Sequence, residues 1–261
     1  MKFRVLTAAA LVTIAALGTA GAADLGVAPI YKALPPPMPV YNWTGCYVGG
    51  GGGYGMWNQE TQLVFNPTPF GPSHNNGGRG WFGTVQVGCD YQVGSNIVIG
   101  AFADYDWSGM KGDFAAVVQT TIGEEKLKSS WAAGGRIGWL PFPQLMVFVS
   151  GGYTEARFDS VTFFDANPIF PGPTGFALPK HTYTGWFLGS GYEYGIGWFP
   201  GLYWKTEYRF ADYGSENVDL VVAATGATTG VSYDLHKRVQ TIRSELVWRF
   251  NWGGSGVTAR Y

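Results

Sequence analysis

Residues able to carry chemistry are few in this sequence, and their spacing matches no catalytic or cofactor-binding pattern. Cys46 and Cys89 are the only cysteines, and no pair of histidines lies near them, so they do not make a metal site. Ser150 precedes two glycines but lacks the strand–turn–helix context of a nucleophile elbow. The glycine run 49–53 has the spacing of a dinucleotide fingerprint, yet it lies inside an expected strand with no helix after it. We therefore predict no enzyme, no cofactor and no bound metal.

Three histidines, His74, His181 and His236, lie in or beside segments that we expect to be long loops. A metal site in these loops is the weaker interpretation, and separate, solvated imidazole rings are the favoured one. Two acids, Asp104 and Asp106, share one face of an expected strand, but the sequence indicates no cleft in which paired carboxylates would meet a substrate.

The two cysteines fall in the first and second expected strands, near the same end of each. On the face assignment given below, Cys46 and Cys89 both point outward, so a hairpin of these strands would bring them together. In an oxidising compartment they would then form a cross-strand disulfide. The alternative is two small, lipid-facing thiols, and the sequence leaves both open.

The N-terminal segment has the order of a secretory signal. Lys2 and Arg4 give it a positive start, the apolar stretch 5–17 follows, and small residues at 20–23 offer cleavage points. The apolar stretch is too short to cross a membrane as a helix, so a retained anchor is the weaker interpretation. We predict that residues 1–22 are a cleaved signal peptide.

The remaining chain divides into a short lead-in and one continuous domain. Its mature form begins at Ala23 or Asp24. Residues 23–42 are rich in proline, which cannot donate to a strand ladder, so we expect an extended lead-in in the periplasm. Residues 43–261 form the domain, and they contain no apolar run of about twenty residues, the length that a transmembrane helix needs.

Composition separates the chain from ordinary soluble proteins. Charged residues make up 13% of it, against about 25% in a typical soluble domain. Aromatic residues reach 16%, and there are 40 glycines, a combination that disfavours helices and suits strands. The formal charge of −1 comes with no basic run, so nucleic acid is not an expected partner.

Period-two alternation predicts eight strands in the domain. They cover residues 43–57, 79–93, 96–107, 130–140, 145–158, 182–196, 202–213 and 238–251. The connections alternate in length, with short turns at 94–95, 141–144 and 197–201 and long segments at 59–78, 108–129, 159–181 and 214–237. Unstructured loops of about twenty residues are uncommon in compact soluble domains. Short periplasmic turns that alternate with long extracellular loops are the rule in outer-membrane barrels.

The predicted fold class is therefore all-β: a single eight-stranded antiparallel transmembrane up-and-down β-barrel with short periplasmic turns and long extracellular loops. Three short turns and four long loops close eight strands with both chain ends in the periplasm, so the count is self-consistent. Residues 43–261 are then the outer-membrane β-barrel domain.

The two faces of the predicted strands differ in chemistry. In the last strand Leu246 and Trp248 share one face, and Arg243 and Glu245 share the other. An eight-stranded interior has room only for packed side chains. Because the apolar face carries too many large aromatic rings for that space, we expect it to face lipid and the charged face to line the lumen.

The lumen is thus predicted to hold a network of charges. Its members are Asp104, Arg136, Glu193, Lys205, Glu207, Arg209, Arg243, Glu245 and Arg249. Buried charges are unfavourable unless they are paired, and acids and bases occur here in similar numbers. A plug of mutually paired charges is therefore favoured over a narrow ion path.

Aromatic residues are expected to form two girdles where the barrel meets the membrane surfaces. Those at the turn end are Trp139, Trp198, Phe199, Trp248 and Phe250, and those at the loop end are Tyr54, Trp57, Trp107 and Tyr213.

Three stretches resemble a known family, the second of which continues from 189–194 to 205–214. They are residues 40–49, an opening strand after a proline-rich lead, 189–194 with 205–214, and the end at 246–252. The sequence resembles the small outer-membrane β-barrel proteins of alphaproteobacteria, the outer membrane immunogenic or porin family protein type. The resemblance implies an eight-stranded barrel in the outer membrane of a Gram-negative cell, with loops exposed at the surface. It also implies that Leu246, Trp248 and Phe250 are an assembly signal for the barrel assembly machinery.

The function predicted from the sequence is a structural and cell-surface interaction role. The expected partners are outer-membrane lipid and, during biogenesis, the barrel assembly machinery, and the sequence names no extracellular ligand or host surface. The alternative is a small-solute, porin-like channel, although an aqueous pore needs about sixteen strands. A secreted, lipocalin-like binder is a third interpretation, which requires solubility without detergent.

Overall fold

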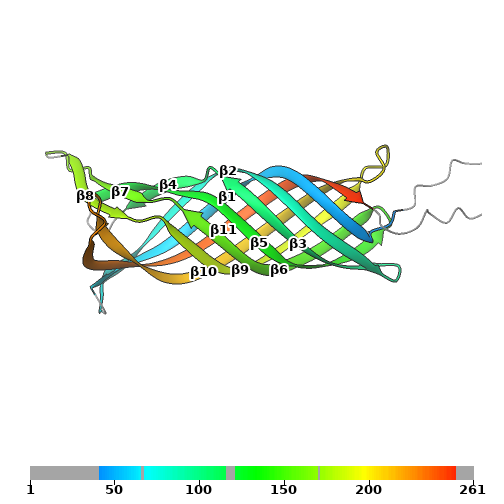
Figure 1. The fold of residues 1–261 in the computed structure, drawn as a ribbon, viewed down its shortest axis with the longest axis horizontal. Helices are drawn as coiled ribbons and strands as arrows, with labels where there is room; N and C mark the ends of the chain where they lie inside the picture. Colours follow the sequence, from blue (N-terminus) through cyan, green and yellow to red (C-terminus); the bar gives the residue numbers. More distant parts are fainter. Residues whose placement is uncertain (1–40, 66–67, 116–120, 170, 251–261) are drawn as a thin grey trace, which may run out of the picture. The chain divides into compact units, whose positions relative to one another are not determined.

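The described part of the chain is built from β-strands. The computed structural model describes residues 41–65, 68–115, 121–169 and 171–250 (Figure 1). Their strands are β1 Gly45–Phe65, β2 Thr68–Val93, β3 Ile97–Ser108, β4 Lys111–Ala115, β5 Thr121–Phe142, β6 Leu145–Phe158, β7 Val161–Asp165, β8 Gly172–Leu178, β9 His181–Gly195, β10 Leu202–Val222 and β11 Thr228–Phe250. The predicted signal peptide, and the lead-in up to residue 40, lie outside the described residues. The described residues include no helix long and apolar enough to cross a membrane.

Eight of these strands close into a barrel. Each pairs antiparallel with its neighbours in the order β1, β2, β3, β5, β6, β9, β10 and β11. The first and last strands then pair with each other from Cys46 opposite Phe250 to Phe65 opposite Val231, which leaves no open edge in the ring. Figure 1 shows the strands wound obliquely around the barrel. The predicted eight-stranded antiparallel barrel is confirmed.

Three short turns lie at one end of the barrel, which we call the turn end. They join β2 to β3, β5 to β6 and β9 to β10. Gly94 (φ +65°) and Gly201 (φ +86°) lie in two of these turns with a backbone conformation that suits glycine and few other residues. The opposite end, where the strands continue into long hairpins, is the hairpin end.

The long connections are not the unstructured loops that we predicted. Pairing of β1 with β2 continues to Phe65 opposite Thr68, and pairing of β10 with β11 continues to Val221 opposite Thr228. The other two long connections contain β4, β7, β8 and the first residues of β5. Most residues in the predicted loops therefore lie in strands, and the barrel wall extends well beyond the predicted strand ends.

These strands are difficult to predict because polar residues in the segments obscure the period-two alternation of buried and exposed side chains. Along β11, Tyr233, Leu235, Lys237 and Val239 are buried, and the residues that alternate with them, 234, 236 and 238, are more exposed. Val218 on β10 is buried as well. Because each buried side chain packs inside the extended wall, the hairpins gain apolar contacts that isolated loops lack.

The two faces of the barrel follow the predicted assignment. On β11, Ile242 is 55% exposed and Leu246 is 46% exposed, whereas Arg243 and Glu245 between them are almost fully buried. The same contrast separates Val85 and Val87 from Gln86 on β2. The exterior thus carries an apolar band, and the interior carries the charges.

The aromatic girdles differ from the prediction at the hairpin end. Trp139, Trp248 and Trp107 face outward as expected. Trp57 and Tyr213 are buried inside the barrel, so the prediction was wrong for both. Each lies an odd number of residues from an outward-facing neighbour in its strand, and alternation therefore turns it inward.

The glycine run of β1 makes room inside the barrel. A Cβ atom on Gly53 would meet the carbonyl oxygen of Ile242 and would lie 2.6 Å from the ring of Phe82. A Cβ atom on Gly50, which points outward, would meet only one atom, at 3.7 Å. The run is therefore a packing feature and not part of a nucleotide site.

We predict that Gly53→Val prevents the barrel from folding, because valine would clash with backbone that cannot move independently. Gly50→Val is the matched control and should fold, since its side chain enters lipid. Refolding in detergent, followed by gel mobility with and without boiling, measures the outcome. Equal folding of the two variants would contradict the assigned faces.

Candidate functional site

The lumen charges form the most distinctive site in the described residues. The structure places all nine predicted residues inside the barrel, and four further charged residues join them. They form three clusters along the barrel axis. From the turn end upward, these are a lower cluster of Asp90, Arg136, Glu193 and Arg249, a middle cluster of Asp104, Asp106, Lys205, Glu207, Arg209, Arg243 and Glu245, and an upper cluster of Glu125 and Lys237.

The lower cluster alternates two guanidinium groups with two carboxylates. Arg136 contacts Asp90 through two nitrogens, at 2.9 and 2.5 Å, and Glu193 at 3.1 Å. Arg249 lies 2.7 Å from Asp90 and donates through Nε to Glu193 at 2.8 Å. Each carboxylate thus bridges both arginines, and the four charges cancel. These contacts join β2, β5, β9 and β11 across the lumen.

Aromatic rings seal the lower cluster from the turn end. Trp43 is fully buried, and its indole nitrogen donates to the carbonyl oxygen of Pro143 at 3.0 Å. The guanidinium of Arg249 lies 4.7 Å from the Trp43 ring centre and 5.1 Å from that of Tyr203, distances at which a cation interacts favourably with a ring face.

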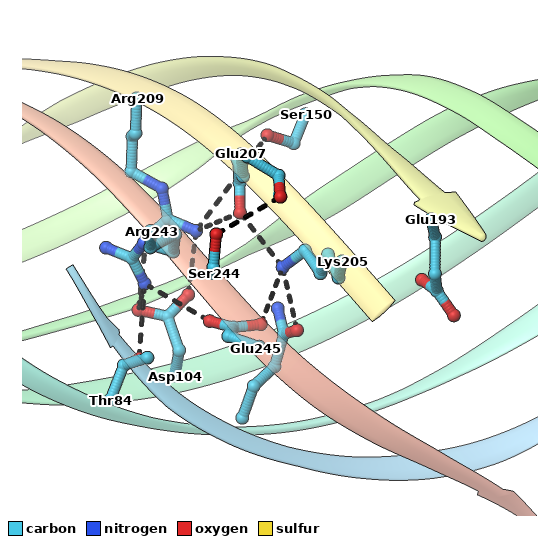
Figure 2. A network of polar contacts seen from close by, with 12 residues as sticks. Thr84, Asp104, Ser150, Glu193, Lys205, Glu207, Arg209, Arg243, Ser244 and Glu245 are labelled. Carbon is cyan, nitrogen blue, oxygen red and sulfur yellow. Dashed lines mark hydrogen bonds and ion pairs between the residues drawn. The ribbon is translucent and has the colours of Figure 1, made fainter. Parts of the chain in front are cut away.

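The middle cluster is centred on Lys205 and Glu207 of β10 (Figure 2). The Lys205 ammonium lies 2.9 Å from Glu207 and 3.2 Å from Glu245, and it donates to Gln86 at 2.8 Å. The hydroxyl of Ser150 donates to Glu207 at 2.7 Å. Ser150 is therefore part of this network.

Two arginines complete the middle cluster. Arg209 binds Asp104 with two parallel hydrogen bonds of 3.0 and 2.8 Å, the fork geometry that gives the strongest arginine–carboxylate pairs. Arg243 lies 2.9 Å from Asp106 and 3.4 Å from Asp104. The centre of the Phe187 ring lies 4.4 Å from the Arg209 guanidinium.

The upper cluster is a lysine enclosed by aromatic rings. The Lys237 ammonium lies 2.6 Å from Glu125 and also donates to Gln59. It lies 4.0 Å from the ring centre of Phe158, 4.8 Å from Tyr183 and 5.3 Å from Trp57. Lys237 is completely buried.

Apolar residues close the barrel above this lysine. The rings of Phe114 and Phe163 lie 5.4 Å apart, and the ring of Tyr233 lies 5.9 Å from that of Phe114. Leu127 and Leu235 are buried in the same extension of the wall. A hydrophobic layer thus lies between the charges and the hairpin end.

One small cavity lies between the middle and upper clusters. It has a volume of about 20 Å³ and lies beside Asp106, Thr154 and Tyr213. That volume holds about one water molecule. The lumen in the described residues is therefore filled by side chains at this level.

Four members of the network lie outside the predicted set, although the sequence places Asp106 on the same lumen face as Asp104. Asp90 and Asp106 share the parity of neighbouring lumen residues, and that signal was available for both. Glu125 and Lys237 fall where we predicted loops, so no face could be assigned to them.

The structure joins Cys46 and Cys89 by a disulfide bond. The two residues lie directly opposite each other on β1 and β2, with their Cα atoms 3.9 Å apart. They face outward with Val48 and Val87, near the turn end. The bond therefore links two neighbouring strands at the lipid-facing surface.

Two histidines are paired with carboxylates and do not stand alone as predicted. His181 lies 2.5 Å from Glu216, and His236 lies 3.0 Å from Asp212. Asp212 also accepts hydrogen bonds from the Gly214 amide at 2.8 Å and from Arg238 at 3.3 Å. Among the described residues, no three potential ligands gather into a metal site.

Comparison with known proteins gives one group of sequence relatives. No family model matches the chain. Over 219 residues it is 29% identical to the 31 kDa outer-membrane immunogenic proteins of Brucella melitensis and Brucella suis, which covers 80% of this chain and 88% of each relative.

Solved structures give more distant similarities. The outer membrane protein OprG of Pseudomonas aeruginosa is 10% identical, with 80% of this chain and 99% of OprG covered and a TM-score of 0.46. Neisserial surface protein A is 13% identical, with 79% and 98% covered and a TM-score of 0.37.

We predict that Lys237→Met destabilises the barrel by about 3–5 kcal/mol, because it leaves the buried Glu125 carboxylate without its partner. The double variant Glu125→Gln/Lys237→Met should recover most of that loss. Urea unfolding in lipid vesicles, followed by tryptophan fluorescence, measures both free energies.

The matched control uses the exposed pair of Lys111 and Glu124, which are 2.9 Å apart and about 60% exposed. Lys111→Met should change stability by about 0–1 kcal/mol, as surface pairs do. The buried-pair assignment is wrong if Lys237→Met is as mild as this control.

We predict that Cys46 and Cys89 resist alkylation in protein isolated from the cell envelope and react only after reduction. Cys46→Ser/Cys89→Ser should still fold, since many cross-strand pairs remain, with a loss of about 2–4 kcal/mol. Mass spectrometry of alkylated protein measures the thiols. Full labelling without reductant would show that the cysteines are free in the cell.

Proposed function

We propose that this chain is a closed, non-conducting scaffold for cell-surface contacts. It is a homologue of the Brucella outer-membrane immunogenic proteins and resides in the outer membrane as a β-barrel. In this role the barrel anchors the protein, and the hairpin end carries the contacts. The role requires no catalysis.

The small space left between charge clusters in the lumen is the observation that supports the proposal. Three charge clusters and the rings around them occupy the axis, and the cavity between two of the clusters has room for about one water molecule. An ion path would require mobile water beside these charges. Here each arginine of the lower cluster instead contacts two carboxylates.

The hairpins support a surface role. They extend the wall beyond the apolar band and expose large apolar side chains near their tips, among them Phe70, Ile122, Ile169 and Phe176. Exposed apolar groups on an ordered frame suit contacts with macromolecules. Extracellular connections in such barrels are longer than periplasmic ones, so the hairpin end is assigned to the exterior.

The outward face of the last strand carries the proposed signal for barrel assembly. Leu246, Trp248 and Phe250 alternate on the outward face of the last strand, and all three are exposed. We assign them as the signal that the barrel assembly machinery reads. The surrounding lipid is then the lasting partner of this face.

We predict that the folded protein shows no stable single-channel conductance in planar bilayers in concentrated potassium chloride. Insertion is checked by the change of gel mobility on boiling, and a trimeric porin serves as the positive control. Stable, uniform conductance steps would contradict the plug and favour the small-solute channel.

A further inference from the structure

Cations outside the lumen gather on one side of the barrel. Among the described residues, the outward lysines and arginines lie on β2, β4, β5, β6 or just before β9, with the exception of Arg238. They are Arg79, Lys111, Lys126, Lys128, Arg157 and Lys180. Cross-strand register makes part of this row continuous, because Lys111 lies opposite both Arg79 and Lys126.

Part of this row surrounds a hollow of about 430 Å³ in the outer surface. Its lining includes Lys128, Arg157, Lys180, His181 and the ring of Tyr105. We call these five residues the lateral basic site. Arg157 and Lys128 are 59% and 69% exposed, so their charged ends are accessible.

The height of the site relative to the membrane is fixed by aromatic rings. Tyr105 lies opposite Trp131 in the strand register, and the rings of Trp131 and Tyr153 lie 5.4 Å apart. The ring of Trp107 lies 4.9 Å from that of Tyr105. Such rings mark the boundary between hydrocarbon and headgroups. The basic side chains begin directly beyond them, at the level of the headgroups.

Nearby acids pair with two of the three lysine and arginine side chains of the site. Asp159 lies 3.8 Å from Lys128, and Glu155 lies 3.2 Å from Arg157. His181 is paired with Glu216. Lys180 has no ion-pair partner among the residues that the structure describes, and the lining of the hollow holds three lysine or arginine side chains against one acid, Asp159, so it keeps a positive balance.

The opposite side of the barrel has the opposite character. A hollow of about 200 Å³ at β1, β10 and β11 is lined by Glu60, Asp234 and His236 with Gln62 and Ser215. Arg238 is the one outward cation on this side among the described residues, and it is bound to Asp212 at 3.3 Å. All the other outward cations in the described part of the chain thus lie on one flank.

We propose that the lateral basic site binds the phosphate groups of a phosphorylated glycolipid in the outer leaflet, with the acyl chains lying on the apolar band below. Lys128, Arg157 and Lys180 contact the phosphates, and Tyr105 packs against the sugar or the first carbons of the chains. The inference rests on the outward orientation of the hairpin end in the proposed function. Lipid, not a soluble polyanion, is the assigned ligand because the cations adjoin the aromatic boundary on the side of the wall.

The experiment measures binding of bisphosphorylated lipid A to the folded, full-length protein in maltoside micelles by native mass spectrometry. Lipid A without phosphates is the comparison probe. We expect the phosphorylated form to bind about tenfold or more tightly, since each cation near such headgroups contributes on the order of 1 kcal/mol, or about fivefold. Lys128→Gln/Arg157→Gln/Lys180→Gln should abolish the preference.

Two controls separate charge from folding. The variant Lys128→Arg/Arg157→Lys/Lys180→Arg keeps every charge and should keep the preference, and Arg238→Gln on the other flank should leave it unchanged. Gel mobility before and after boiling establishes that each variant is folded. The proposal is overturned if the glutamine variant keeps the preference or if both lipids bind equally.

Soluble competitors identify the source of the phosphate. Inorganic phosphate and sucrose octasulfate, each added at concentrations equal to the lipid, should displace little lipid A, because neither has acyl chains to occupy the band. Complete displacement by either would overturn the lipid assignment. The conductance experiment is independent of this one, so failure here leaves the closed scaffold unaffected.

Discussion

The structure depends on pairing every charge that the closed wall traps inside. An eight-stranded barrel has a narrow interior, and an unpaired ion there would lose its hydration without compensation. The carboxylates of Asp90 and Glu193 each meet both arginines of the lower cluster. A shift of β10 by one residue would turn Lys205 toward lipid and leave its partners unpaired. The charges therefore favour one register as well as one closed ring.

The paired charges in turn determine where small and large side chains can lie inside the barrel. The charged side chains need space in the lumen, and glycine provides it at Gly189, where a Cβ atom would lie 2.6 Å from the Glu207 carboxylate. Aromatic rings fill what the guanidinium groups leave, as Phe187 does beside Arg209 and as three rings do around Lys237. Small and large residues alternate inside for this reason, and the cavity that remains between the clusters is close to the volume of one water molecule.

Period-two alternation was sufficient to predict the barrel, its outward face and the nine lumen charges. It could not predict partners, because Arg136 meets Glu193 through the tilt and stagger of strands 57 residues apart. It fails where polar residues interrupt the alternation of apolar and polar side chains. The pattern there predicts loops in place of the hairpins, so it does not predict the pair of Lys237 and Glu125. Trp57 was placed in a girdle by its type, although its parity turns it inward. Local pattern determines faces, and only the closed ring determines neighbours.

Because the interior charges satisfy one another, the charges outside are not needed to hold the barrel together. Lys128, Arg157 and Lys180 make at most exposed ion pairs, which contribute little to stability. Their position is nevertheless well defined, since the wall continues above the apolar band as paired strands and not as loops. Arg157 lies opposite Ser129 on β5 and Thr182 on β9, which holds it at a fixed height above the aromatic boundary. The row of cations at headgroup level therefore contributes little to the stability of the fold. The reason for its placement on one side lies in what surrounds the barrel.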